Sequence, residues 1–475
     1  RALDFVSSLP NVDPSRIAVT GASGGGTQTF ILFNVDPRPA IAFPAVMVGE
    51  EMQGGCVCEN APLLRIGTDN CELAATFAPK PLGMSAANDW TRAMETDTYP
   101  KIQTIYGFFS AKKNVLGKHF SFEHNYNQVS REMMYNWFND HLKLGWPKPV
   151  KEKPFEPVAP RDLSVYDDQH PRPADTADAT TLRKYMTAAS DRQLEELWKS
   201  NPDEYRQTVR EALKAMVHDQ IPAAGEVVVS RTSGPQTMDG ITIETGALSR
   251  RGADEAVPYV SLVPTDWNGK VVIWVSPEGK SELFGADGKP NQSVQNLLRQ
   301  KTAVVSADLY LTGEYVSHSQ PRRTDNGKYE GQNYAGFYYG YNRGTLANRV
   351  HDLLSLISLV RQWAGTQSVD LVATGKTATA ALLARGLAGD AIHRGAIDLG
   401  GFDFDQVTDP LDPMMLPGAL KYGDVCGFIP LCDAGQTLVS GVAKSAASDR
   451  TLGLKSVTVR NESAQPAELL NWLNH

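Results

Sequence analysis

The run Gly21-Ala22-Ser23-Gly24-Gly25-Gly26 is the feature that most restricts how this chain can fold. It follows a short apolar segment, residues 16–20, whose composition is typical of a strand, and it precedes a helical stretch over 27–33. Glycines permit the sharp change of direction that joins a strand directly to a helix. Further strands and helices are predicted to alternate beyond it: strands over 40–48, 81–87 and 115–122, and helices over 99–110 and 128–144. This alternation predicts an α/β fold with a parallel sheet covered on both faces.

The same pattern recurs later in the chain. Residues 352–377 align with residues 2–23 and place Gly375 on Gly21. The closing helix of each half contains an Asn-Trp pair, at Asn136 and at Asn471. We therefore expect two copies of one fold in tandem.

The two expected copies of the fold predict how the chain divides into domains. We expect the C-terminal part of a first domain in residues 1–146, a Pro-rich linker and helical segment in 147–224, and a second domain in 225–475. Residues 225–350 precede the repeated helix in the second copy, and the first copy has no counterpart of them. We expect that the first copy lacks its N-terminal strands in this chain. A further segment of the same protein would then pack beside the strand at 17–20 and supply the second oxyanion donor.

Composition excludes several classes of function. A net charge of -8 over 475 residues argues against nucleic-acid binding. No stretch approaches the ~20 apolar residues that span a bilayer, so no membrane is expected. Five cysteines are too few for a disulfide scaffold.

Gly21-x-Ser23-x-Gly25 between a strand and a helix is the pattern of a nucleophile elbow. The sharp turn lifts the serine hydroxyl away from the end of the sheet. The backbone N–H of Gly24, at the start of the helix, is then placed to stabilise an oxyanion. An ordinary Gly-rich turn is the alternative to Ser23 as a nucleophile.

A serine nucleophile needs a base and an acid, which follow it in the order Ser, acid, His in this fold. Asp89 and His124 each come just after a predicted strand, so we predict Asp89 as the acid and His124 as the base. A helix N-cap is the alternative role for Asp89, and a capping or surface role for His124. His119 is the competing base and Glu59 a less favoured acid.

Several motifs resemble the acetylxylan-esterase-like α/β-hydrolases of bacteria, which are serine esterases related in fold to dienelactone hydrolase. They are GASGGGTQT from Gly21, MQGGCVCEN (52–60), APKPLGMSAANDW (78–90), HNYN (124–127) and REMMYNWFNDHLKLG (131–145). The match is close over 1–170 and looser beyond.

This resemblance implies hydrolysis of an ester, typically an acetyl group on plant polysaccharide, by Ser23, Asp89 and His124 without a cofactor. It also implies a secreted or periplasmic protein.

The second copy departs from the pattern. Thr377 falls on the nucleophile position, with Lys376 before it and Ala378 after it, and the histidine beyond the last strand is the terminal His475. We expect this copy to be degenerate and non-catalytic. The aromatic run from Tyr334 to Tyr341 would stack on sugars or form a packed interface.

Other interpretations remain open at this point. A serine peptidase of the prolyl-oligopeptidase type shares the elbow, although no blade-length repeat is visible. A non-catalytic carbohydrate-binding subunit would explain the degenerate copy. Cys56, Cys58 and Cys71 lack the spacing of a zinc site and favour thiols or one disulfide, and Cys426 and Cys432 have the spacing to close a small loop.

Overall fold

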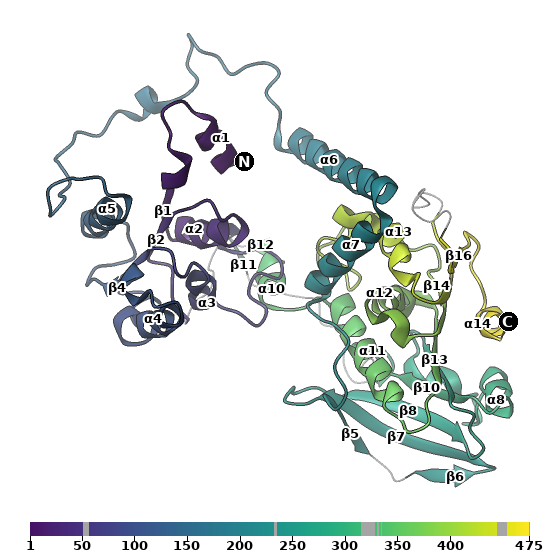
Figure 1. The fold of residues 1–475 in the computed structure, drawn as a ribbon. Coiled ribbons are helices and arrows are strands. Elements are labelled where there is room, and N and C mark those ends of the chain that lie inside the picture. Colours follow the sequence, from purple (N-terminus) through teal and green to yellow (C-terminus); the bar gives the residue numbers. More distant parts are fainter. Residues whose placement is uncertain are drawn as a thin grey trace. The chain divides into compact units, whose positions relative to one another are not determined.

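The computed structural model describes residues 1–50, 57–231, 235–314, 328–329, 332–333, 335–443 and 454–474. The chain forms two compact units (Figure 1). Unit 1 comprises Arg1–Thr176 with Asn326–Asn342, and unit 2 comprises Ala177–Asp325 with Arg343–His475. The helical part of the segment 147–224 belongs to unit 2, which begins at Ala177. Its apolar side chains, among them Val209 and Leu213, are buried in the core of unit 2.

Unit 1 is built on a four-stranded parallel sheet in the order β1-β2-β3-β4. Its strands are β1 (Ala18–Ala22), β2 (Ile41–Ala45), β3 (Leu82–Ala86) and β4 (Val115–His119). All four follow the predicted strands, although β4 ends earlier than expected. Because the strands are parallel, the loops that follow them meet at one edge of the sheet.

Helices cover both faces of this sheet. They are α1 (Ala2–Ser8), α2 (Gly24–Val35), α3 (Asn70–Ala75), α4 (Tyr99–Phe108), α5 (Gln128–Leu142) and α10 (Gly336–Tyr341). Successive side chains of β2 point to opposite faces. Ala42 packs in one core with α2, α3 and α4, whereas Phe43 packs in a second core with Trp137 of α5. The predicted alternation of strands and helices is confirmed.

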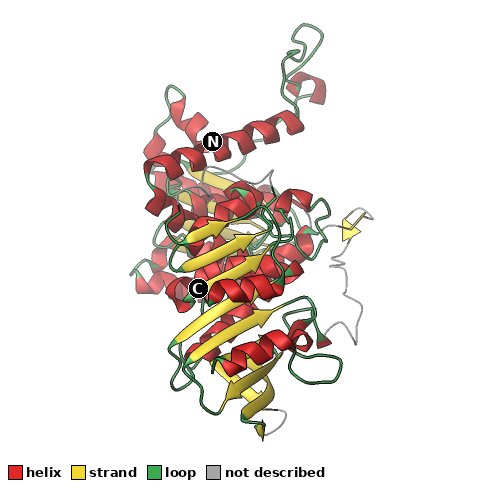
Figure 2. Cartoon of the chain, turned by 90° about the vertical axis from the view of Figure 1, so that its right-hand side faces the viewer, coloured by secondary structure: helices red, strands yellow, loops and turns green. Residues whose placement is uncertain are grey.

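Unit 2 is built on a ten-stranded mixed sheet, visible as the long stack of arrows in Figure 2. Its main path runs β16-β15-β14-β13-β9-β10-β8-β7-β5, and β6 pairs with β7. The strands are β5 (Val227–Arg231), β6 (Gln236–Met238), β7 (Ile241–Arg250), β8 (Val257–Pro264), β9 (Lys270–Val275), β10 (Ala303–Ala307), β13 (Ser368–Ala373), β14 (Arg394–Asp398), β15 (Gln436–Ser440) and β16 (Val457–Val459). The neighbours from β16 to β10 pair in parallel, whereas β8, β7 and β5 are antiparallel.

The faces of this sheet carry two separate cores. Ile273 of β9 packs in the core with α7, α11 and α12, and Trp274 packs in the core with α8 and α14. The helices are α6 (Ala179–Ser200), α7 (Pro202–Val217), α8 (Gln292–Arg299), α11 (Thr345–Arg361), α12 (Ala378–Ala388), α13 (Asp424–Phe428) and α14 (Pro466–Leu473). No helix in the described part of the chain is long and apolar enough to cross a membrane.

The two sheets share one order of elements. The strands β13-β14-β15-β16 are parallel and consecutive, as β1-β2-β3-β4 are. Helix α12 follows β13 as α2 follows β1, and α14 follows β16 as α5 follows β4. β1 is an end strand of its sheet. That a further segment packs beside it stays a prediction.

Candidate active site

Ser23 lies between β1 and α2 in a strained backbone conformation, with φ 55° and ψ -122°. A positive φ costs a residue with a side chain about 1–3 kcal/mol, which the surrounding structure must offset. The backbone of Ser23 connects strand β2 to the start of helix α2. Its N–H donates to the carbonyl of Ala45 at 3.2 Å, and its own carbonyl accepts from Thr27 at 3.0 Å. This is the sharp strand-to-helix turn that the sequence predicts.

The neighbouring glycines are required by close packing. A Cβ on Gly21 would lie 2.3 Å from the carbonyl oxygen of Gly25, and one on Gly26 would lie 2.7 Å from Cβ of Met47. Gly24 faces Cys58, whose Sγ would lie 2.5 Å from an added Cβ. A Cβ on Gly25 would meet nothing within 4 Å. Gly24 is the first residue of α2, so its N–H belongs to the unpaired donors at a helix N-terminus.

Asp89 and His124 are directly hydrogen-bonded. Oδ2 of Asp89 accepts from Nδ1 of His124 at 2.7 Å, and Oδ1 accepts from N and Oγ1 of Thr91 at 2.7 Å and 2.5 Å. The Asp89 side chain is 8% exposed and that of His124 33% exposed. The Trp90 ring packs on the imidazole with centroids 4.6 Å apart. Asp89 therefore fixes the tautomer of His124 and leaves Nε2 to act as a base.

The segment that follows β4 reaches back across the sheet to β1. The hydroxyl of Tyr126 lies 2.7 Å from Oγ1 of Thr20, and Thr20 also donates to the carbonyl of Phe43 at 2.8 Å. Burial raises the pKa of Tyr126 to about 12, so the phenol stays protonated at neutral pH. This contact brings the sequence neighbours of His124 and of Ser23 together although β1 and β4 are opposite ends of the sheet.

The hydroxyl of Ser23 donates to Oε1 of Glu59 at 3.3 Å. Glu59 is buried, 3% exposed, and ends the short 3-10 turn Val57–Glu59 that follows β2. Gln28 of α2 holds this turn by donating to the carbonyl of Cys58 at 3.0 Å. Between the side chains of Ser23 and His124, both within the described residues, there is no hydrogen bond. The structure thus brings together Asp89 with His124, and Ser23 with Glu59.

His119 is the last residue of β4 and has a different partner. Its Nε2 lies 3.0 Å from Oδ1 of Asn88. The N–H of Asn88 donates to the carbonyl of Phe122 at 2.8 Å, so this pair ties the loop after β3 to the loop after β4.

The corresponding position in unit 2 is built differently. Thr377 has φ -91° and ψ -15°, without the strain of Ser23. It is fully buried, and its hydroxyl donates to the carbonyl of Thr374 at 2.9 Å. His475 lies outside the described residues. Because the Thr377 hydroxyl is bonded to this backbone carbonyl, it is not presented to a substrate.

The cysteines carry no sign of a shared role in the site. Cys58, Cys71, Cys426 and Cys432 are thiols, and Cys56 lies outside the described residues. Burial raises the pKa of Cys71 to about 12 and that of Cys432 to about 11, which keeps both protonated and unreactive. The loop closure expected for Cys426 and Cys432 is not formed: both are thiols, and both are buried in the core of unit 2.

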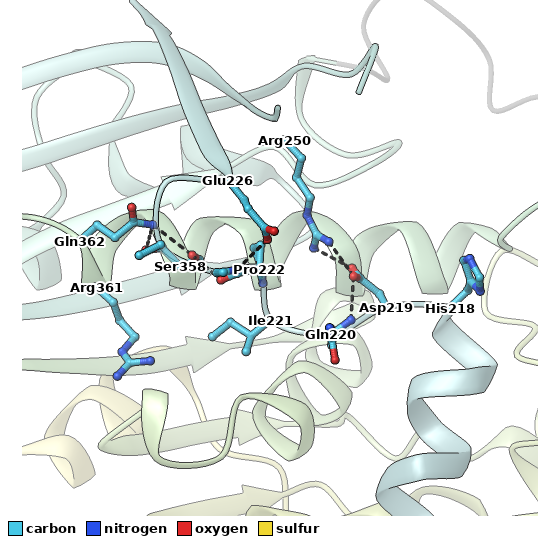
Figure 3. Close-up of a pocket in the computed structure, with 12 residues that line it drawn as sticks. His218, Asp219, Gln220, Ile221, Pro222, Glu226, Arg250, Ser358, Arg361 and Gln362 are labelled. Carbon is cyan, nitrogen blue, oxygen red and sulfur yellow. Dashed lines mark hydrogen bonds and ion pairs between the residues drawn. The ribbon is translucent and has the colours of Figure 1, made fainter. Parts of the chain in front are cut away.

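A cavity of about 770 Å³ lies elsewhere, in unit 2 beside the segment from His218 to Ala224 (Figure 3). Three of its charged groups make hydrogen bonds at its wall. Arg250 donates to both oxygens of Asp219 at 2.6 Å and 2.7 Å, and Glu226 accepts from the N–H of Ala223 at 2.7 Å. We place the candidate site at Ser23, because the strained turn and the hydrogen-bonded Asp89–His124 pair lie in unit 1.

No family model and no curated protein matches the chain. Among solved structures it is similar to the methylesterase BT1017, with 37% identity over 29% of this chain and a TM-score of 0.28. The match spans 33% of that methylesterase.

Two further solved structures are esterases. One is a glucuronoyl esterase from Solibacter usitatus, at 9% identity over 59% of this chain and 92% of that one, with a TM-score of 0.38. The other is acetyl xylan esterase 1 from Thermoanaerobacterium sp., at 13% identity over 55% of this chain and 92% of that one, with a TM-score of 0.34.

Proposed function

We propose that unit 1 is a serine esterase that removes ester-linked groups, acetyl above all, from a carbohydrate. The observation that carries the proposal is the strained Ser23 at the same sheet edge as the hydrogen-bonded Asp89–His124 pair. A strained serine at a helix N-terminus and an oriented imidazole with a free Nε2 are the parts that acyl transfer requires.

The reaction follows from these groups. Oγ of Ser23 attacks the ester carbonyl carbon, and its proton passes to Nε2 of His124. The N–H of Gly24 stabilises the oxyanion, and Asp89 stabilises the imidazolium. The C–O bond breaks, the alcohol leaves with the proton from His124, and the acyl group stays on Ser23. Water, deprotonated by His124, then releases the acid and restores the serine.

In the resting site the Ser23 hydroxyl is held by Glu59. Substrate entry therefore requires it to exchange that acceptor for Nε2 of His124. Catalytic hydrogen bonds are often incomplete before substrate binds, and the return of the 124–127 segment to β1 through Tyr126 favours this exchange.

We also propose that unit 2 is a non-catalytic copy of the same fold. The shared order of β1–β4 and β13–β16 supports a common architecture. The relaxed, buried Thr377 supports the absence of a nucleophile there.

The test is turnover of p-nitrophenyl acetate and acetate release from acetylated xylan, together with covalent labelling by a fluorophosphonate. The parent chain should turn over the ester and be labelled once, and Ser23→Ala should lose both. Ser121→Ala, a serine beyond β4, is the matched control and should keep both. Equal labelling of Ser23→Ala would overturn the assignment, and cleavage of a peptide amide in preference to the ester would favour a peptidase.

A further inference from the structure

Helix α10 comes from the sequence of unit 2 and yet is part of unit 1. It lies between β10 and α11 in the chain, but its contacts group it with unit 1. The N–H of Leu63 donates to the carbonyl of Tyr339 at 2.6 Å, and that of Arg65 donates to Gly340 at 2.9 Å. Gly340 packs so closely that an added Cβ would lie 3.2 Å from Oδ1 of Asn60. The helix is thus attached to the segment that directly follows Glu59.

Arg65 connects α10 to Glu59. Its side chain is 4% exposed, its Nη1 donates to the carbonyl of Glu59 at 2.7 Å, and its Nε donates to Asn70 at 3.0 Å. The Tyr341 ring lies 5.8 Å from Cζ of Arg65. Nη2 has no hydrogen-bond partner among the described residues.

The charges of this group depend on one another. Burial lowers the pKa of Arg65, and the Tyr341 ring and Glu59 both act in the opposite direction and favour its cation. Glu59 is itself buried beside Ser23. Burying a carboxylate without a nearby cation is costly, and Arg65 supplies a cation that interacts electrostatically with Glu59.

We propose that Arg65, held by Tyr341 of α10, positions Glu59 against the nucleophile, so that the middle of the chain contributes to the ester site of unit 1. The proposal rests on the proposed esterase function. Arg65 and Tyr341 are positioning residues that act through Glu59. The path of contacts runs from Tyr341 to Arg65, from Arg65 to Glu59, and from Glu59 to Ser23.

A double-mutant cycle on Arg65 and Glu59 tests the first link. Arg65→Met and Glu59→Gln should each lower kcat by about tenfold, with KM changed by less than about twofold, because neither residue touches the substrate. The double variant should be no slower than the slower single variant, since both changes remove one function. Arg65→Lys should recover part of the loss. The proposal would be overturned if the two single losses in kcat multiplied in the double variant. Equal losses in Arg65→Lys and Arg65→Met would also overturn it.

A second pair of variants tests the link to α10. Tyr341→Leu removes the ring that faces Arg65 and should lower kcat by about threefold. Tyr338→Leu is the matched control on the same helix, because the Tyr338 ring packs on Tyr339, and it should leave kcat unchanged. Equal kcat values in the two variants would overturn the role of α10, even if Arg65→Met fails to fold.

The parent chain separates this inference from the proposed function. If the parent does not hydrolyse esters, the proposed function fails. If the parent and Tyr338→Leu are active and Tyr341→Leu and Arg65→Met match them, the esterase assignment stands and the positioning role is wrong.

Discussion

Nδ1 of His124 lies 2.7 Å from Oδ2 of Asp89, and this hydrogen bond joins the loops that follow β4 and β3. The second oxygen of Asp89 is occupied by Thr91, so the carboxylate cannot turn away. Both groups come just after strands that the sequence predicts. Their contact gives the imidazole one orientation.

The first prediction ranks the two histidines of this region. His124→Ala should lower kcat for p-nitrophenyl acetate by about 10³-fold or more, because Ser23 would lose its base. His119→Ala should keep substantial activity, since His119 bonds to Asn88 and supports a loop. Steady-state kinetics of the two variants measure the ranking. A reversed order would move the base to His119.

The second prediction compares two adjacent glycines of α2. Gly26→Ala should lower the free energy of unfolding by about 1–3 kcal/mol, because the new methyl group would lie 2.7 Å from Cβ of Met47 and 3.1 Å from the carbonyl of Ala45. Gly25→Ala adds the same group in open space and should stay within about 1 kcal/mol of the parent. Thermal unfolding monitored by circular dichroism gives both values. Equal losses would contradict the packing described for this turn.

The third prediction concerns the equivalent position in unit 2. Thr377→Ala should leave ester turnover within about threefold of the parent, because the Thr377 hydroxyl is buried and bonded to the carbonyl of Thr374. Thr377→Ser keeps that hydroxyl and serves as the control for packing. A loss as large as that of Ser23→Ala would identify unit 2 as a second active site.

The fourth prediction is a pH dependence of stability in unit 2. Burial by itself would lower the pKa of His351, but its hydrogen bonds to Asp219 and Glu255, each 2.8 Å, raise it above the usual 6.5. Arg343, 2.5 Å from Nδ1, and Arg250 act against this rise without cancelling it. A histidine whose pKa is raised by folding stabilises the folded state below pH 6.5, and this stabilisation is lost as pH rises through the folded pKa.

The free energy of unfolding of the parent should therefore exceed that of His351→Gln by more at about pH 6 than at about pH 9, by a margin of about 1 kcal/mol. His393→Gln, which removes a side chain that is 61% exposed, is the control and should show a smaller change with pH. Denaturant unfolding at the two pH values measures the margin. A margin of zero would mean that folding does not raise the pKa of His351.

The local sequence pattern was enough to predict the strands of unit 1, because each is a short apolar run bounded by turn residues. The same kind of pattern also predicted helices α2 and α5. In unit 2 the strands β6, β7, β14 and β15 and the helices α8 and α13 were not predicted. The segment Arg394–Asp398 carries a charged residue at each end, so its sequence does not distinguish a strand from a loop. It forms a strand because it pairs with β13 and β15.

The candidate site likewise has residues that local sequence signals predict and contacts that they do not. Ser23, Asp89 and His124 could be placed from the sequence, since a glycine turn and strand-end residues are local signals and parallel strands bring their ends to one edge. The bond from Ser23 to Glu59, and the link through Arg65 to Tyr341, had no local signal. They join segments far apart in the chain, and such contacts exist only once folding has brought those segments together. Local sequence signals indicate which residues carry reactive groups. Which of those residues meet depends on folding, because burial and pairing are properties of the whole packed unit.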